Sequence, residues 1–199
     1  MIENFLRRPT SLSEWVADGI RLLGILGAVA AFVFFTPTDG GIVALALPAL
    51  MVPRFLGARA GFDVLFGVVV TVAAWSNVLH LYRTLDGWDL VVHFVATAVI
   101  AAMTYLALRI TGVVPEQEGL RRVPIVLVPT IGLAVSGIWE VIEWAGKTFV
   151  TDEIFVTYQD TIGDLVAGGA GAFAAGLLVA SVRIERLDPT TARVLAGAR

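Results

Sequence analysis

Six apolar segments of membrane-spanning length run through this chain and leave little room for a soluble fold. Each is close to the roughly 20 apolar residues that cross a bilayer as a helix. Their expected helical limits are 18–35, 41–56, 62–82, 88–110, 123–146 and 161–182. Only 16% of residues are charged, whereas about a quarter are charged in soluble domains. The sequence therefore predicts an all-α polytopic membrane protein with about six transmembrane helices in one bundle.

We expect one transmembrane domain over residues 1–199, with an N-terminal cytoplasmic or interfacial segment at 1–17 and a cytoplasmic tail at 184–199. Ser11 and Glu14 have the spacing of a capping box, so a helix should begin near Ser11. The segment 41–56 is short and contains two prolines, which also fits a re-entrant segment.

Basic residues are divided unevenly between the two ends of the six segments. With six spans, the end that carries both termini receives the following arginines: Arg7, Arg8, Arg21, Arg54, Arg59, Arg109, Arg121, Arg122, Arg183, Arg186, Arg193 and Arg199. The opposite end receives only Arg83 and Lys147. Cytoplasmic loops of membrane proteins are enriched in Lys and Arg. This division favours six full spans, with both termini in the cytoplasm.

Composition also excludes several classes of function. The chain has no cysteine, so disulfides, thiolate metal ligands and a cysteine nucleophile are ruled out. It has no basic stripe or nucleic-acid-binding motif, and nucleic acid is not an expected partner. We find no Ser-His-Asp set and no glycine-rich phosphate loop. Membrane lipid is the expected partner, and a homo-oligomer is compatible with the sequence.

Acidic and histidine side chains gather at the end that is poor in arginine. Both histidines of the chain, His80 and His93, belong to this set. Three pairs have spacings that put both members on one face of a helix. The pairs are Asp89 with His93, Glu140 with Glu143, and Asp160 with Asp164. Four segments thus place ionisable groups at one expected depth.

Some of these residues have ordinary explanations. Asp89 and Asp160 lie at helix starts, where aspartate caps free N–H groups. Glu140 and Glu143 lie near a helix C-terminus, where the helix dipole disfavours negative charge, and they need a compensating cation. Lys147 can compensate one of the two glutamates.

We therefore expect a divalent cation, Zn²⁺, Mn²⁺, Mg²⁺ or Fe²⁺, to be bound at this end, because oxygen-rich ligand sets with imidazole suit such ions. The candidate ligands are His93, Glu140, Glu143, Asp164 and His80. Asp89 and Asp160 are the candidate catalytic residues, which would orient His93 or accept a proton.

Three sequence motifs resemble the YjdF-like family of bacterial inner-membrane proteins. The motifs are D-L-V-V-H-F at 89–94, W-E-V-I-E-W at 139–144 and D-T-I-G-D-L at 160–165. Their order and spacing match that family's pattern over the second half of the chain. The resemblance implies a multi-pass protein of the bacterial inner membrane and implies no particular activity.

Three classes of function remain open on the residues alone. A metal-dependent hydrolase would use the bound ion to activate water against a lipid or lipid-linked phosphate. A proton- or cation-coupled transporter would also carry intramembrane acids, but the other half of each span is almost purely apolar. An accessory subunit would use the polar residues to fix helix pairing. We favour the enzyme over the transporter, and both over the accessory subunit.

Overall fold

The computed structural model describes residues 1–115, 122–151, 154 and 156–186. Six helices in these residues are long and apolar enough to cross a membrane, which confirms the predicted fold class. They are α2 (Leu12–Phe34), α3 (Pro37–Leu56), α4 (Ala60–Val78), α6 (Trp88–Ile110), α7 (Arg122–Phe149) and α8 (Tyr158–Val179). Two short helices, α1 (Ile2–Leu6) and α5 (Leu81–Thr84), complete the set. Arg121, Arg193, Arg199 and most of the expected tail lie outside the described residues.

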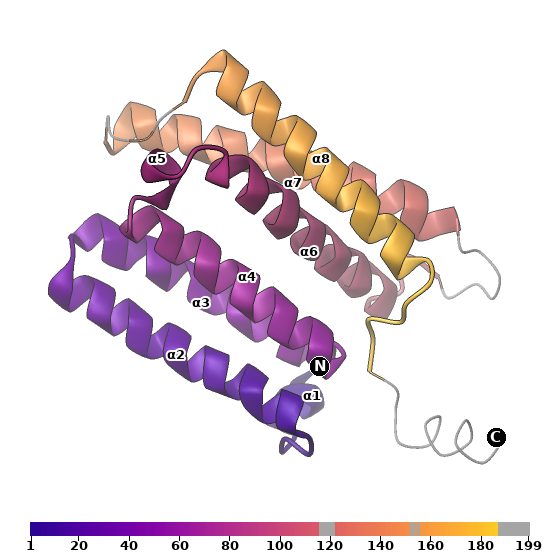
Figure 1. Ribbon diagram of the computed structural model, residues 1–199. Helices are drawn as coiled ribbons and strands as arrows, with labels where there is room; N and C mark the ends of the chain where they lie inside the picture. The colour runs from indigo at the N-terminus through magenta and orange to yellow at the C-terminus, as the bar shows by residue number, and fades with distance from the viewer. Residues whose placement is uncertain (116–121, 152–153, 155, 187–199) are drawn as a thin grey trace, which may run out of the picture.

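The helices form two groups of three that lie side by side (Figure 1). Helices α2, α3 and α4 pack against one another, and so do α6, α7 and α8. Helix α6 joins the groups through its contacts with α3 and α4. Because each group has three consecutive antiparallel helices, the second group starts at the opposite end of the bundle from the first. Functional groups at the start of α2 and at the start of α6 are therefore far apart.

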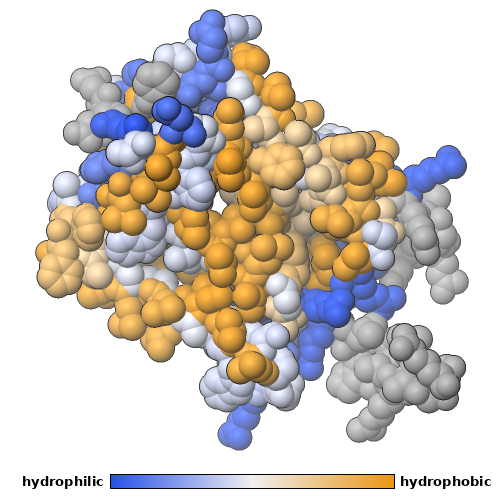
Figure 2. All heavy atoms as spheres, in the orientation of Figure 1, coloured by the Kyte–Doolittle hydropathy of each residue, from blue (hydrophilic) through white to orange (hydrophobic). Residues whose placement is uncertain are grey.

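Apolar side chains cover the outside of the bundle between its two ends (Figure 2). Leu45 on α3 and Val126 on α7 are 80% and 68% exposed, and hydrophilic residues gather toward the helix ends. A surface of this kind is suited to lipid, in which only helices or closed barrels satisfy their backbone groups.

Five of the six spans begin before the residues predicted for them, by the most in α2 and α3, and the helix start expected near Ser11 is confirmed. Helix α2 begins at Leu12 and runs unbroken to Phe34, and the Ser11 hydroxyl caps it by accepting a hydrogen bond from the Glu14 N–H at 3.3 Å. Helix α3 begins at Pro37, because Thr36 and Asp39 form a capping box. The expected loop before α3 is thus its first turn, and the helix gains enough length to cross a membrane despite its internal prolines.

The predicted extension of the third span to residue 82 is wrong. Helix α4 ends at Val78, and His80 adopts a left-handed conformation with φ of 55°. The chain then folds back along α4, where the Tyr82 hydroxyl donates to the Ala73 carbonyl at 2.9 Å and the Trp88 indole donates to Ser76 at 3.0 Å. These tertiary contacts hold the turn, and no helix-breaking residue announces it in the sequence.

Small residues let α8 lie close against both α6 and α7. A β-carbon at Gly171 would collide with the Phe94 carbonyl oxygen of α6, and one at Gly176 would lie 2.8 Å from the Pro124 carbonyl oxygen of α7. Close approach of this kind is the usual use of small residues in membrane helices. It fixes the middle and the end of α8 between its two neighbours, and Asp160 and Asp164 lie in the first two turns of the same helix.

The end of the bundle that carries α1 and residues 182–186 is called the basic end here. The segment after α8 pairs with the α3–α4 turn, through hydrogen bonds from the Arg59 N–H to the Ile184 carbonyl (2.8 Å) and from the Arg186 N–H to the Gly57 carbonyl (3.0 Å). The opposite end, called the acidic end, is defined by five carboxylates at the starts of α6 and α8 and near the end of α7: Asp89, Glu140, Glu143, Asp160 and Asp164.

Candidate metal centre

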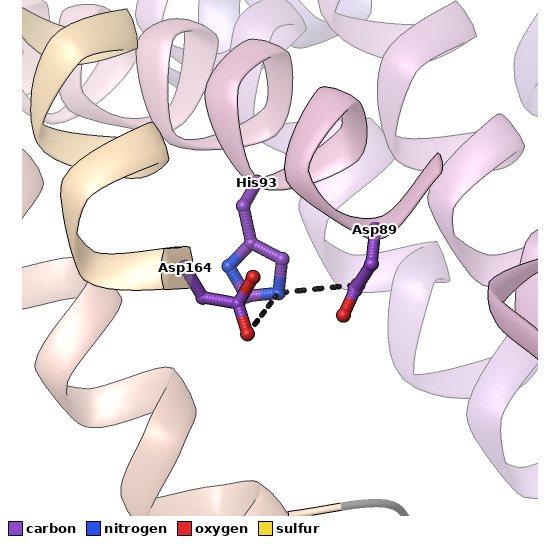
Figure 3. Close-up of side chains that lie close together, drawn as sticks. All are labelled: Asp89, His93 and Asp164. Atoms are coloured by element: carbon purple, nitrogen blue, oxygen red, sulfur yellow. Dashed lines mark ion pairs between the residues drawn. The ribbon is translucent and has the colours of Figure 1, made fainter. Parts of the chain in front are cut away.

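Three helices bring His93, Glu140 and Asp164 into one buried layer at the acidic end. His93 lies in the second turn of α6, Asp164 in the second turn of α8, and Glu140 on α7. Their residues are 7%, 8% and 1% exposed. The His93 Nε2 atom is 3.5 Å from an Asp89 carboxylate oxygen and 3.9 Å from one of Asp164, so the imidazole points between the two acids (Figure 3).

Several carboxylate oxygens in this layer have no hydrogen-bond donor among the described residues. Both oxygens of Asp164 and the Oε1 atom of Glu140 are buried in this way. A buried charged group without a partner costs several kcal/mol, so such groups are normally paired, protonated or bound to a metal. These buried carboxylate oxygens without hydrogen-bond donors are therefore the strongest indication that the site binds a cation.

The remaining acids lie at a partly open mouth above this buried layer. The Asp89 side chain is 34% exposed, and Asp160 and Glu143 are half-buried. Glu143 accepts a hydrogen bond from the Trp139 indole through Oε1 at 2.9 Å, which fixes the carboxylate while leaving its second oxygen available. The site is thus closed toward the middle of the bundle and reachable from the acidic end.

The ligand atoms are close enough for metal coordination in two sets. Asp89, His93 and Asp164 each offer one atom within 4.8 Å of the others, and so do His93, Glu140 and Glu143. Carboxylates with one imidazole suit Zn²⁺, Mn²⁺, Mg²⁺ and Fe²⁺. The donor set therefore fits the class of ion that the sequence suggests.

Two of the ordinary explanations for these residues are wrong. Gly87 and Thr157 occupy the N-cap positions of α6 and α8, so neither Asp89 nor Asp160 is the cap. Lys147 does not reach the glutamates, because its Nζ atom donates to the Val156 carbonyl at 3.2 Å. Among the described residues, His93 is the only positively chargeable side chain within 4 Å of a carboxylate oxygen of the five acids, and Lys147 acts on Asp160 through a longer-range charge interaction.

His80 lies apart from the other predicted ligands. It is exposed at the turn between α4 and α5 and belongs to neither coordinating set. The early end of α4 explains this, because the left-handed turn at His80 takes the side chain off the helix face that would have carried it inward.

Two hydroxyl groups lie at the site that are not among its sequence-predicted residues, and a third belongs to a tyrosine with no predicted site role. Thr97 on α6 and Ser136 on α7 lie one turn below His93 and Glu140, and their oxygens are 3.3 Å apart in a buried contact. Spacings of four from the predicted ligands would have found both. The Tyr82 hydroxyl lies near the mouth, where burial raises its pKa above the usual range and the charges of Asp89 and Glu143 add to the effect.

A comparison with protein families places the whole bundle in one group. Residues 5–185 match the model of a family described as "Predicted membrane protein (DUF2238)". The chain belongs to this family. The match confirms the membrane family expected from the motifs and extends it over the first half of the chain, which those motifs do not cover. Neither a curated protein nor a solved structure matches the chain.

Proposed function

We propose that this DUF2238 protein binds a divalent cation at its acidic end and uses it to hydrolyse a lipid or lipid-linked substrate. The observation that carries the proposal is the set of buried, orphaned oxygens of Glu140 and Asp164 beside His93. A cation would compensate these carboxylates where the described protein residues do not. The proposed location is the bacterial inner membrane, with the basic end in the cytoplasm and the acidic end facing the opposite side.

The chemistry expected at this site is water activation. When bound, a divalent cation lowers the pKa of a coordinated water and polarises a substrate oxygen. Asp89 and Asp160 lie at the mouth, where either carboxylate can accept the proton that the attacking water loses. The water oxygen forms the new bond to the substrate centre, the bond to the leaving oxygen breaks, and the same carboxylate returns the proton to that oxygen. The products are an alcohol and an acid.

Packing below the site favours hydrolysis over transport through this half of the bundle. The Thr97–Ser136 contact lies directly beneath the buried layer, and Ala101, Gly132 and Ala172 follow one turn deeper. Ala101 and Ala172 are fully buried, and a β-carbon added to Gly132 would collide with Ala172. A carrier would need these close contacts to separate, whereas a hydrolase needs access only from the mouth.

The proposal is tested on the full-length protein purified in detergent without added metal. We expect about one ion per chain or more by elemental analysis, and a lower metal content in the Glu140→Gln, Glu143→Gln double variant. Asp86→Asn is the matched control, because it removes a carboxylate at the same end from an exposed position between α5 and α6. Its metal content should equal that of the wild type.

Activity is then measured in vesicles that contain lipid and lipid-linked esters. Metal-dependent release of product that the double variant lacks would support the hydrolase. Bound metal without hydrolysis, but with cation or proton uptake into the vesicles, would favour the carrier instead. An absence of metal from folded wild-type protein would indicate protonated acids and end the proposal.

A further inference from the structure

We infer that the acidic end holds two neighbouring divalent cations and that its substrate is a phosphate ester at the level of the lipid headgroups. This inference rests on the proposed function and makes it more specific. Two coordinating sets share His93: one adds Asp89 and Asp164 from α6 and α8, and the other adds Glu140 and Glu143 from α7. Each set is a triad. A neutral imidazole has one free nitrogen lone pair, so His93 would ligate one of the two ions and the other would be held by the two carboxylates of its own set.

Coordination geometry separates the two triads. Oxygen and nitrogen ligands lie about 2.0–2.2 Å from Zn²⁺ or Mg²⁺, so two ligands of one ion are at most about 4.4 Å apart. Within each triad the ligand atoms lie within 4.8 Å of one another, close to that limit. The described residues form no larger set that meets this spacing. One ion can therefore engage one triad, and the carboxylates of the other are left without a cation.

The charge balance at the acidic end also favours two divalent cations. The five carboxylates carry five negative charges when ionised, one divalent cation offsets two of them, and a pair offsets four. Asp164 and Glu140 belong to different triads, and both have buried oxygens without hydrogen-bond donors among the described residues. A single ion would satisfy one of these side chains and leave the other orphaned, at a cost that a second ion removes.

A cation pair indicates a class of substrate. Two divalent ions about 3.5–4 Å apart stabilise both the attacking and the leaving oxygen in an in-line displacement at phosphorus. The half-exposed acids at the mouth lie at the membrane-facing end of the site, where a phosphorylated lipid would present its headgroup. Water attacks phosphorus, the bond from phosphorus to the alcohol oxygen breaks, and the proton lost by the water ends on that oxygen.

The pair is tested by loading the metal-free, full-length protein with Mn²⁺ in detergent. We expect two Mn²⁺ per chain by elemental analysis and an electron paramagnetic resonance spectrum of coupled ions. Asp164→Asn should reduce the content to one ion and give the spectrum of an isolated ion, and Glu143→Gln should do so from the other triad. Asp86→Asn should keep two coupled ions. If Asp164→Asn does not fold, the half-exposed Asp89→Asn replaces it as the variant of the first triad.

The possible outcomes separate this inference from the proposed function. One uncoupled Mn²⁺ in the wild type overturns the pair and leaves a mononuclear hydrolase standing. No Mn²⁺ overturns both. Substrate class is tested in mixed micelles of phosphatidic acid against micelles of a carboxylic-ester lipid without phosphate. Release of inorganic phosphate supports the inference, and cleavage of the carboxylic ester alone overturns it.

Discussion

Arginine matches the buried carboxylates at the basic end, whereas those at the acidic end have only one imidazole beside them. Arg21 of α2 uses all three of its guanidinium nitrogens: two pair with Asp63 (2.5 Å) and Asp18 (2.9 Å), and the third donates to the Leu50 carbonyl (3.0 Å). Arg54 adds a second contact to Asp18 at 3.5 Å. At the acidic end, Asp164 is equally buried and its oxygens lack a donor among the described residues.

The difference shows what each end of the bundle is built to do. A buried carboxylate that is matched by arginine has its charge compensated inside the chain, so it holds helices together and has no need of an external ion. A buried carboxylate without such a match keeps its coordination positions open. The same fold therefore supports a structural ion-pair network in one half and a candidate ion-binding site in the other, at opposite ends.

The largest expected effect is at the basic end. Arg21→Ala leaves Asp63 buried without its cation, and breaking a buried pair in this way costs about 3–5 kcal/mol. We expect a large fall in the unfolding temperature in detergent. Arg83→Ala, which removes an exposed arginine at the other end, should change stability by less than about 0.5 kcal/mol. Equal effects of the two substitutions would show that the Arg21 network is not a structural element.

Asp164→Asn is the counterpart of that substitution at the acidic end. In metal-free protein it removes a buried charge whose oxygens have no hydrogen-bond donor among the described residues and whose ion pair with His93 is long, at 3.9 Å, so we expect unchanged or increased stability. A loss as large as that of Arg21→Ala would mean that Asp164 is already compensated within the protein.

Divalent cations should stabilise the wild type through the acidic end alone. At a free ion concentration 100 times Kd, binding adds about 2.7 kcal/mol to the free energy of unfolding. The gain should shrink in Asp164→Asn, which keeps the set of His93, Glu140 and Glu143, and should remain in full in Asp86→Asn, as measured by thermal unfolding with metal and with chelator. It should also shrink as pH falls, because protons compete with metal for the carboxylates. A gain that is undiminished in Asp164→Asn would place the ion elsewhere.

Packing of α8 connects the candidate site to the rest of the fold. A substitution that disturbs this packing is expected to have an intermediate effect on stability. Gly171→Ala places a methyl group against the Phe94 carbonyl, and overpacking of this kind costs about 1–3 kcal/mol. Gly137→Ala on α7 has open space around it, so it should leave stability unchanged or raise it slightly. If both substitutions were neutral in thermal unfolding, α8 would not be held as closely as the structure indicates.

The smallest effect is expected at His80. Its exposed position outside both triads predicts that His80→Ala leaves metal content unchanged and stability within about 0.5 kcal/mol. Elemental analysis checks this directly. A loss of bound metal in His80→Ala would restore His80 to the ligand set that the sequence suggests and would require the α4–α5 turn to rearrange.

Much of the fold can be predicted from the lengths of the apolar segments. The errors in the predicted helix limits occur where local chemistry or tertiary contacts determine the end of a helix. The limits of α6 are predicted to the residue, because Gly87 and Thr111 bound a mostly apolar segment of membrane-spanning length. The start of α3 could have been found from the Thr36–Asp39 capping box. The end of α4 could not, since the Tyr82 and Trp88 hydrogen bonds that hold the turn join residues up to twelve positions apart.

Most residues of the candidate site can be predicted from the sequence, but their division into two coordinating sets cannot. Helical spacing puts Asp89 with His93, and Glu140 with Glu143, on shared faces, and the structure brings these faces together. Spacing within one helix cannot show that Asp164 joins the first pair and not the second, because that depends on how closely α8 approaches α6. It also cannot show that Lys147 turns away to the Val156 carbonyl.

Anomalous diffraction from crystals of the full-length protein soaked in Zn²⁺ tests the central claim most directly. Zn²⁺ is the appropriate probe because nitrogen and oxygen sites bind it more tightly than Mg²⁺ or Mn²⁺. We expect an anomalous peak at the acidic end, about 2.0–2.2 Å from carboxylate oxygens of the buried layer formed by His93, Glu140 and Asp164. Peaks confined to surface residues, with Glu140 and Asp164 unligated, would contradict the claim that these carboxylates are held open for a cation.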